Sequence, residues 1–406
     1  MAREIILQKL PVGWSYNLLD NIAERCSGHT PSKSFPEYWN GGIKWISLAD
    51  SCRLDKGYVY ETDKEISLEG IKNSSAEVHP AETVVLSRDA GVGKSGVMAT
   101  PMAVSQHFIA WKCDNKEKLH SWYLYNWLQL NKEEFERQAV GSTIKTIGLP
   151  YFKKLRIAVP PFDEQKKIAQ ILSTWDKAIS VTEKLLTNSQ QQKKALMQQL
   201  LTGKKRLLDE NGVRFSGVWE KYSLEELESL QWIELGRGKV ISKKDILNMP
   251  GRYPIYSSSV KNGGLMGCYG MFMFDEELIS WSVDGGGDFF YRPKHKFSVT
   301  NVSGYMRVQC SKISYPFLAS QLQLQHSALE FDYQSKAHPS VIRKLYEVVL
   351  PELREQQKIA VVLSTADAEI STLEKKLACL KDEKKALMQQ LLTGKRRVKV
   401  DEAVAE

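Results

Sequence analysis

The sequence has no long hydrophobic run and no paired cysteines. No stretch of its 406 residues approaches the roughly 18 uncharged apolar positions of a membrane-spanning helix, so a membrane protein is not expected. The first fourteen residues lack a long apolar core and a small-residue cleavage site, which predicts no secretory signal. The six cysteines are scattered without a Cys-x-x-Cys pair, as is typical of free thiols in a reducing compartment. We therefore expect a cytoplasmic protein.

Motifs of catalysis and metal binding are also missing. The sequence contains no Asn-Pro-Pro-Tyr or Asp-Pro-Pro-Tyr, no His-Glu-x-x-His, and its seven histidines do not cluster. Cys26 and His29 form one Cys-x-x-His pair without the second pair that a structural zinc site needs, so no metal ligands are assigned. We expect no catalytic residue in this chain.

The segment Gly91–Gly96 resembles a nucleotide-binding loop only superficially. It contains both Gly-x-Gly-x-x-Gly and Gly-Lys-Ser, but Arg88 stands where a P-loop has its first glycine. The residues that follow, GVMATPMAV, do not form the helix that a dinucleotide site requires. We predict a turn between two strands here and no bound nucleotide.

What the chain does contain is an internal repeat. Residues 164–206 and 355–397 align without a gap at an offset of 191, and more than half of the aligned positions are identical, including all of KKALMQQLLTGK. Before each copy, a short apolar run ends at Pro160 or Pro351, and a helix is expected just after it. The repeat predicts five segments: a variable domain at 1–159, a helix at 160–206, a variable domain at 207–350, a helix at 351–397 and a tail at 398–406.

The repeated helices carry the 3.5-residue spacing of a coiled coil. Apolar positions alternate at intervals of four and three, which places them on one seam. The polar residues Ser189, Lys193 and Lys384 occupy seam positions, where they weaken the seam locally and can fix its register. Gly203 and Gly394 follow the last seam residues and suit helix C-caps. The predicted seam residues are Ile168, Leu172, Trp175, Ile179, Leu186, Leu196, Leu200, Ile359, Leu363, Ile370, Leu377, Leu387 and Leu391.

The two variable segments have the composition of mixed α+β domains. Short β-branched or aromatic runs alternate with Gly, Asn and Ser clusters, as in IKWISL, ETVVLSR and QHFIAW of the first segment and YPIYSSS, LISWSV and SGYMRVQ of the second. Helical patterns interrupt them at 119–138 and 315–332. The predicted fold is therefore α+β, with two globular domains separated by two long antiparallel coiled-coil helices in a pseudo-twofold repeat.

These features together resemble one protein family. A helix with the pattern Pro-x-x-x-Glu-Gln-x-x-Ile-Ala-x-x-Leu, ending in Leu-Leu-Thr-Gly-Lys, occurs twice, from Pro160 to Lys204 and from Pro351 to Lys395. Each follows a divergent domain, as in the DNA specificity subunits of type I restriction-modification systems. Residues 27–33 (SGHTPSK) and 236–239 (GRGK) also look like the starts of the target-recognition domains of that family.

The resemblance implies a function in defence against foreign DNA. Each variable domain would recognise one half of a bipartite, asymmetric DNA target, and the helices would set the spacing between the halves. The chain itself would be non-catalytic and would bind no cofactor. Two methyltransferase subunits, which modify adenine, and motor-nuclease subunits would join it, and S-adenosylmethionine, ATP and magnesium would be bound by those partners. A coiled-coil scaffold with protein-binding domains and no DNA specificity remains the alternative.

Candidate DNA contacts are basic or small polar residues in predicted loops. Arg, Lys, Asn and Gln can recognise base edges, and cationic or hydroxyl side chains contact phosphates. Residues 141–150 and 334–344 occupy corresponding places before the two helices, which favours both segments. The candidates are Thr30, Ser32, Lys33, Lys44, Arg88, Lys94, Ser142, Thr143 and Lys145 in the first domain, and Arg237, Lys239, Lys243, Lys261, Asn262, Arg292, Lys294, Ser335, Lys336 and His338 in the second.

The distribution of charge is uneven. The formal net charge is +8, but residues 164–206 carry +6 and residues 355–397 carry +3, whereas the variable segments are nearly neutral. Recognition by the variable domains must then use local basic patches. We expect much of the neutralisation of DNA phosphates to come from partner subunits.

Overall fold

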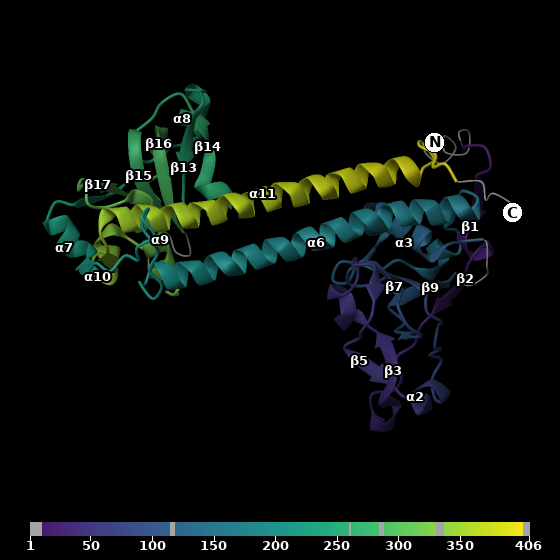
Figure 1. The fold of residues 1–406 in the computed structure, drawn as a ribbon. Helices are drawn as coiled ribbons and strands as arrows, with labels where there is room; N and C mark the ends of the chain where they lie inside the picture. The colour runs from purple at the N-terminus through teal and green to yellow at the C-terminus, as the bar shows by residue number, and fades with distance from the viewer. Residues whose placement is uncertain (1–9, 114–117, 260, 284–287, 330–336, 401–406) are drawn as a thin grey trace. The chain divides into compact units, whose positions relative to one another are not determined.

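The chain divides into two compact units that each combine distant parts of the sequence. The structure is a computed structural model that describes residues 10–113, 118–259, 261–283, 288–329 and 337–400. One unit comprises Met1–Glu183 with Lys376–Glu406, and the other comprises Lys184–Lys375. Each unit therefore contains one globular domain and one half of each long helix, α6 (Phe162–Leu200) and α11 (Leu353–Leu391). The two helices are teal and yellow in Figure 1.

The first globular domain contains two main sheets and a short closing sheet. The five-stranded sheet has the order β2-β9-β6-β7-β4, the three-stranded sheet β5-β3-β8, and β1 pairs with β10. The strands are β1 (Ser15–Leu18), β2 (Glu24–Ser27), β3 (Trp39–Ile46), β4 (Tyr58–Val59), β5 (Lys64–Ile66), β6 (Val84–Ser87), β7 (Ser95–Met98), β8 (Ala103–Val104), β9 (Phe108–Lys112) and β10 (Arg156–Val159). The helices are η1 (Leu19–Asn21), η2 (Pro36–Tyr38), η3 (Leu48–Cys52), α2 (Leu68–Lys72), α3 (Ser121–Leu130), α4 (Lys132–Gln138) and α5 (Leu149–Phe152).

The second globular domain has one larger sheet with helices beside it. Six strands lie in the order β12-β17-β15-β16-β13-β14, and β11 pairs with β18. The strands are β11 (Glu220–Ser223), β12 (Ile233–Arg237), β13 (Tyr253–Tyr256), β14 (Leu265–Tyr269), β15 (Phe274–Ser282), β16 (Phe289–Val299), β17 (Ser303–Val308) and β18 (Glu347–Leu350). The helices are α7 (Leu224–Ser229), α8 (Lys243–Asn248), η4 (Lys261–Gly264), α9 (Tyr315–His326) and α10 (Pro339–Leu345).

The six predicted strand runs are confirmed, and the two helical patterns are confirmed in part. The pattern predicted at 315–332 forms α9 only as far as His326, and residues 330–332 lie outside the described residues. All six predicted strand runs contain strands of the sheets, and the apolar runs before Pro160 and Pro351 form β10 and β18. The helical pattern at 119–138 is divided into α3 and α4 at Asn131, whose backbone is not helical. The Gly91–Gly96 segment lies at the turn that joins β6 to β7, which pair antiparallel, as expected for a turn between strands.

Both domains are closed in the same way. In the first, β1 pairs antiparallel with β10, the strand directly before α6. In the second, β11 pairs antiparallel with β18, the strand directly before α11. Because the first and last strands of each domain are neighbours, each long helix leaves its domain from a fixed point. This repeated closure is hidden in the sequence, because the strands of the two pairs share little identity.

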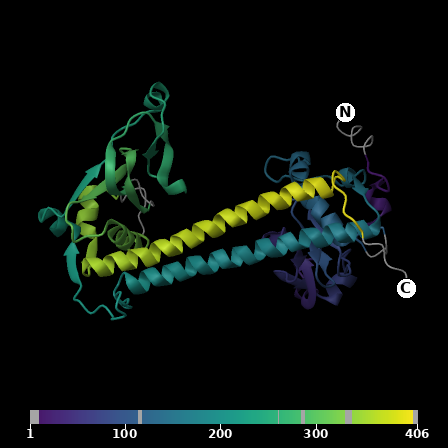
Figure 2. The same ribbon diagram turned by 45° about the horizontal axis from the view of Figure 1, so that its top comes forward.

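Each domain core includes side chains from both long helices. The main core of the first domain contains Ile168 and Leu172 from the start of α6 together with Leu391 from the end of α11. The core of the second contains Leu200 from the end of α6 and Ile359 from the start of α11. In each unit the helix segments lie side by side (Figures 1 and 2). Much of the apolar stripe on these helices therefore packs against a globular domain as well as against the other helix.

The pairing of α6 with α11 is antiparallel within each unit. In the first unit, Asp176 contacts Lys384 while Glu183, further along α6, contacts Lys381, which lies earlier on α11. In the second unit, Lys193 contacts Asp367. Among the described residues, no helix is sufficiently long and apolar to cross a lipid bilayer.

Candidate nucleic-acid interface

An ion pair with a buried glutamate joins the start of each long helix to the end of the other repeat. Glu355 is fully buried and accepts hydrogen bonds from Arg206 Nε at 2.6 Å and Nη2 at 2.7 Å. Glu164 is matched in the same way by Arg397, with both distances at 2.7 Å. Both arginines keep a raised pKa, chiefly because they hydrogen-bond these carboxylates. The two pairs are related by the repeat offset of 191 residues.

The glutamine that follows each glutamate holds the adjoining domain. Gln165 Nε2 donates to the carbonyl oxygens of Lys118 and Pro160, both at 3.0 Å, and its Oε1 accepts from His120 N. Gln356 makes the corresponding bonds with the backbone of Lys312, Pro351 and Ser314. The glutamine of the repeated Glu-Gln motif therefore satisfies buried backbone groups where domain and helix meet, a role that the local sequence does not indicate.

The glycines after the helices make room for a tryptophan or a proline of the domains. Gly203 has a φ of +71° and Gly394 a φ of +73°, the left-handed conformation of helix C-caps. A side chain on Gly394 would approach Pro11 to 2.4 Å, and one on Gly203 would touch Trp219. The start of each domain thus packs on the end of a repeat helix.

The predicted seam residues lie buried or half-buried. Those near the helix ends enter the domain cores, and the central ones are partly covered. Fully or nearly buried are Ile168, Leu172, Leu200, Ile359, Leu363 and Leu391, whereas Trp175, Ile179, Leu186, Leu196, Ile370, Leu377 and Leu387 are half-buried. Lys193 and Lys384 reach across to Asp367 and Asp176, and Ser189 Oγ donates to Glu369 at 3.0 Å. Lys193–Asp367 and Lys384–Asp176 are again equivalent in the repeat, and they specify the register of the pairing.

Several candidates of the first domain are engaged in the fold. Lys94 Nζ donates to Ser51 Oγ at 2.8 Å, and Thr30 Oγ1 hydrogen-bonds the Gln106 side chain. Trp39 Nε1 donates to the carbonyl oxygen of Ser32, while the Lys33 side chain is exposed.

One group of first-domain candidates comes together. Arg88 donates to the carbonyl oxygen of Ile147 and thereby holds the segment that carries Ser142, Thr143 and Lys145, all of them exposed. Backbone pairing between Asp89 and Thr146 adds to this attachment. The structure therefore places three predicted residues on a loop that is fixed to the β6–β7 turn.

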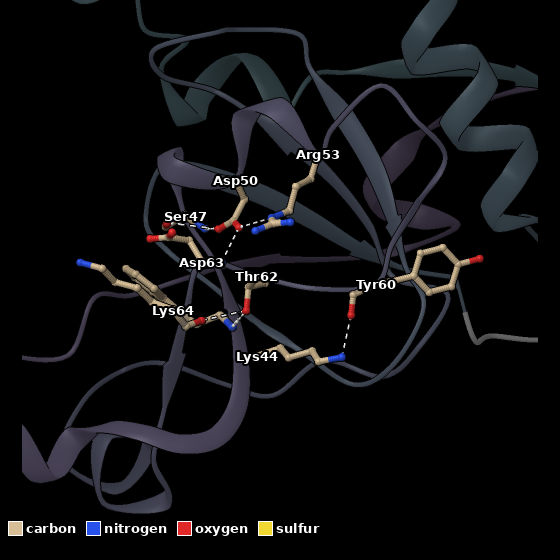
Figure 3. Close-up of polar contacts among 9 residues, drawn as sticks. Lys44, Ser47, Asp50, Arg53, Tyr60, Thr62, Asp63 and Lys64 are labelled. Carbon is tan, nitrogen blue, oxygen red and sulfur yellow. Dashed lines mark hydrogen bonds and ion pairs between the residues drawn. The ribbon is translucent and has the colours of Figure 1, made fainter. Parts of the chain in front are cut away.

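Lys44 lies on strand β3 rather than in the predicted loop, and its side chain holds the loop between β4 and β5 (Figure 3). Its Nζ donates to the carbonyl oxygen of Tyr60 at 2.6 Å and to Glu61 at 3.0 Å. Fully buried Asp50 accepts from the backbone N–H groups of Ser47 and Asp63 and from Arg53 Nε. These bonds fix the chain between β4 and β5, where Tyr60 is 63% exposed. The exposure of Tyr60 could not be predicted, because nothing in the sequence around a single tyrosine distinguishes an exposed ring from a core ring.

In the second domain, five predicted residues gather at one end of the sheet. Arg237 Nη2 donates to the carbonyl oxygen of Asn301, and Lys239 N donates to that of Val299. Thr300 Oγ1 donates to Ser257 Oγ, and Arg292 Nη2 donates to the carbonyl oxygen of Gly263. These bonds join the end of β12, the β13–β14 turn, β16 and the β16–β17 turn. We call this set the basic end: Arg237, Lys239, Lys261, Asn262 and Arg292.

The remaining second-domain candidates lie elsewhere. Lys243 is exposed at the first position of α8, and Lys294 is exposed on β16. His338 is the N-cap of α10, where its Nδ1 accepts from Ser340 N at 3.3 Å. Ser335 and Lys336 lie outside the described residues.

A comparison with known families agrees with this architecture. The model of the type I restriction modification DNA specificity domain matches the chain twice, over residues 11–188 and 217–381. The chain belongs to this DNA specificity family. The two matched regions each cover one globular domain and part of the helix that follows it.

Curated relatives are specificity subunits. The chain is 28% identical over 184 residues to the specificity subunit of the type I restriction enzyme MjaIX of Methanocaldococcus jannaschii, covering 45% of this chain and 42% of that protein. It is 29% identical over 214 residues to a putative type I specificity subunit of Mycoplasma pneumoniae, covering 52% of this chain and 82% of that protein. The match thus spans less than half the length of the first of these relatives.

Solved structures show the same fold. The S subunit of a type I restriction-modification system from M. genitalium matches with a TM-score of 0.61 and 16% identity, covering 95% of this chain and 98% of that one. A chain from a study of assembly and conformational transition in a type I system matches with a TM-score of 0.56 and 14% identity, covering 96% of this chain and all of that one. The α+β fold of this specificity family, with long paired helices, is therefore the fold of this chain.

Proposed function

We propose that this chain is the non-catalytic subunit that recognises DNA for a type I restriction-modification complex. It would bind a bipartite, asymmetric target, with one half-site for each globular domain. The observation that carries the proposal is the repeated attachment. Two domains of unlike sequence are held on equivalent helix ends by equivalent Glu–Arg ion pairs and by equivalent hydrogen bonds from a glutamine to the backbone. A scaffold of this kind carries two different recognition surfaces on one chain.

The exposed faces of the repeat support two copies of one partner. In residues 193–204 every position is identical to its counterpart in residues 384–395, including exposed positions such as Ala195 and Gln198. In the eight residues before this block, by contrast, only Leu186 is shared with the other copy. Packing does not require identity at exposed sites, so a common binding partner explains the difference. We propose that this partner is the adenine methyltransferase subunit, one on each copy.

Catalysis and cofactor binding would belong to the partner subunits. The chain contains no adenine-methyltransferase motif, so methyl transfer from S-adenosylmethionine would occur in the docked methyltransferases. Motor-nuclease subunits, with ATP and magnesium, would join the same complex for restriction. This chain would supply the sequence specificity to both reactions.

Methylation mapping of the host genome tests DNA recognition. Deletion of the gene should abolish adenine methylation at one asymmetric bipartite motif and leave other motifs unchanged. If every methylated motif survives the deletion, the chain does not direct methylation in that host, and the scaffold alternative gains support. Incubation of the purified chain alone with DNA and S-adenosylmethionine should transfer no methyl group, and any transfer would contradict the non-catalytic assignment.

A matched pair of variants tests the docking surface. Substituting Ala195→Arg together with Ala386→Arg adds bulk to the identical exposed block and lowers helix propensity only slightly. We expect this double variant to lose co-purification with the methyltransferase. Gln191→Arg is the control, because Gln191 is exposed on the same helix but differs from its counterpart, Asp382. Equal retention of the methyltransferase by both variants would remove the docking proposal.

A further inference from the structure

Arg292 is a buried cation without a carboxylate partner in the described part of the chain. Its side chain lies on β16 and is only 7% exposed. The guanidinium carbon lies 3.7 Å from the centroid of the Tyr256 ring and 4.7 Å from that of Phe290. Its hydrogen bonds go to neutral acceptors, Ser280 Oγ at 2.8 Å and the Gly263 carbonyl oxygen at 2.7 Å. A buried charge is costly unless an opposite charge compensates it, so this arrangement needs an explanation.

Another arginine of the same sheet, Arg307, has its charge compensated by carboxylates. Arg307 on β17 donates to Glu276 through Nε at 2.8 Å and Nη2 at 2.7 Å, and to Glu234 through Nη1 at 2.6 Å. Arg307 is more exposed than Arg292, yet it has two carboxylate partners. The domain therefore provides acidic partners for one arginine and none, among the described residues, for the more deeply buried one.

The sheet face around Arg292 is lined with hydroxyl groups. In the antiparallel register, Ser280 lies opposite Phe290, Ser282 lies opposite Ser303, and these residues share the face of Arg292. Ser303 Oγ is buried and makes no hydrogen bond to any described residue. Hydroxyl groups and guanidinium N–H groups are the donors with which proteins bind phosphate oxygens. The same sheet face thus carries a buried charge without an acidic partner on β16 and, across β15, a buried hydroxyl on β17 without a described partner.

The turn that covers Arg292 carries further phosphate-binding features. Asn262, Gly263 and Gly264 all have positive φ values, so η4 is a tight turn. This turn holds the carbonyl oxygen of Gly263 against Arg292. Lys261 and Asn262 are exposed on this turn. Arg237 and Lys239 of the same basic end also form no ion pair with any residue the structure describes, so their charges remain available to an anion. A polyanion that approaches this end would meet several cations in succession.

We propose that the basic end of the second domain binds a phosphate of the DNA backbone, with the Arg292 guanidinium as the charge that the phosphate neutralises. This inference rests on the proposed function, because it supplies a contact point for the same DNA. Burial lowers the pKa of Arg292 to about 10, so the guanidinium remains charged at neutral pH. Arg292 would also hold the turn at Gly263, which places Lys261 beside the same phosphate.

The test compares DNA binding by variants of the full chain in its complex with the methyltransferase. The probe is a duplex that contains the motif identified by methylation mapping, with binding measured across a range of salt concentrations. Arg292→Met should weaken binding about tenfold, because a charge-assisted contact is lost. It should also reduce the slope of log affinity against log salt by about one, the contribution of one phosphate contact. Arg292→Lys keeps the charge and should keep the slope.

Stability separates this role from a structural one. Because Arg292→Met removes a buried charge without a partner, its melting temperature should not fall below that of the native chain by more than a few degrees. Arg307→Met is the control: it leaves two carboxylates unpaired, should lower the melting temperature more, and should leave the salt slope unchanged. The methylated motif should stay the same in Arg292→Met, since a phosphate contact carries no sequence information.

Three outcomes would overturn the inference while leaving the proposed function intact. These are unchanged affinity and slope in Arg292→Met, a loss of affinity that merely accompanies a large fall in melting temperature, and a changed methylated motif. If no methylated motif depends on the native chain, the proposed function itself fails, so the two failures are distinguishable.

Discussion

The buried pair of Glu355 and Arg206 provides the sharpest prediction about stability. Glu355 is fully buried and accepts three hydrogen bonds, two from Arg206 and one from Trp219 Nε1 at 3.3 Å. Arg206→Met removes the guanidinium and leaves a buried carboxylate with the Trp219 bond alone. Breaking a buried ion pair in this way costs about 3–5 kcal/mol. We expect this loss in the free energy of unfolding of the full chain, measured by urea denaturation.

The repeat supplies a natural control for this prediction. Arg397 makes the same contacts with Glu164, but its side chain is 42% exposed whereas that of Arg206 is 20% exposed. Water can reach Glu164 more easily after Arg397→Met, so we expect a smaller loss, about 1–3 kcal/mol. The double variant Arg206→Met with Glu355→Gln should recover part of the loss, because it removes the unpaired charge.

The reasoning fails if Arg206→Met destabilises the chain no more than Arg397→Met. That result would mean that burial does not control the strength of these pairs. The reasoning also fails if the double variant is as unstable as Arg206→Met alone, because the cost would then come from lost packing.

Three further predictions address the helices, the charge and the pH dependence. Deleting or inserting equal numbers of residues in the middle of α6 and α11 should change the spacer of the methylated motif and preserve both half-sites, as mapping of methylated DNA would show; altered half-sites would contradict this. The chain alone should bind DNA weakly and with a shallow dependence on salt, because its variable domains are nearly neutral, so a tight complex in a titration without partners would refute the division of charge. The hydrogen bond from Arg307 lowers the pKa of Glu276 below its ordinary value of 4.5, so the stability that it contributes is present above that pH and is lost as the pH falls through the lowered value. The free energy of unfolding of the Glu276→Gln variant should therefore fall less steeply on acidification than that of the native chain. Identical acid unfolding curves would exclude this contribution.

The helices were predictable because their signal is local and repeated. The four–three spacing of apolar residues, the prolines before each helix and the glycines after it are short-range patterns, and the second copy reproduces the first. The strands were also predictable as runs, since β6 and β9 are dense in β-branched and aromatic residues. Their order in the sheets was not, because pairing joins residues far apart in sequence, as in the contact of β2 with β9.

The candidate contacts were predictable by residue type but not by placement. Lys44 and Lys94 are as basic as Lys33, yet the structure places the first two in hydrogen bonds within the first domain. Five second-domain candidates lie together at the basic end, although they come from segments up to 55 residues apart. Nothing in the local sequence of Arg292 distinguishes it from a solvated arginine. Its burial depends on the β13–β14 turn, which closes over it.

By itself, the sequence determined that the chain is a duplicated unit, that each unit pairs a divergent domain with a conserved helix, and that the net positive charge belongs to the helices. These properties depend on composition and short-range spacing. Only the tertiary structure decided that each compact unit takes half of both helices, that Glu164 and Glu355 are paired with arginines more than 140 residues away, and that Arg292 is buried without a described carboxylate. The reason is physical: burial and charge pairing depend on which distant segments meet, and the antiparallel pairing of the helices brings the end of one repeat to the start of the other.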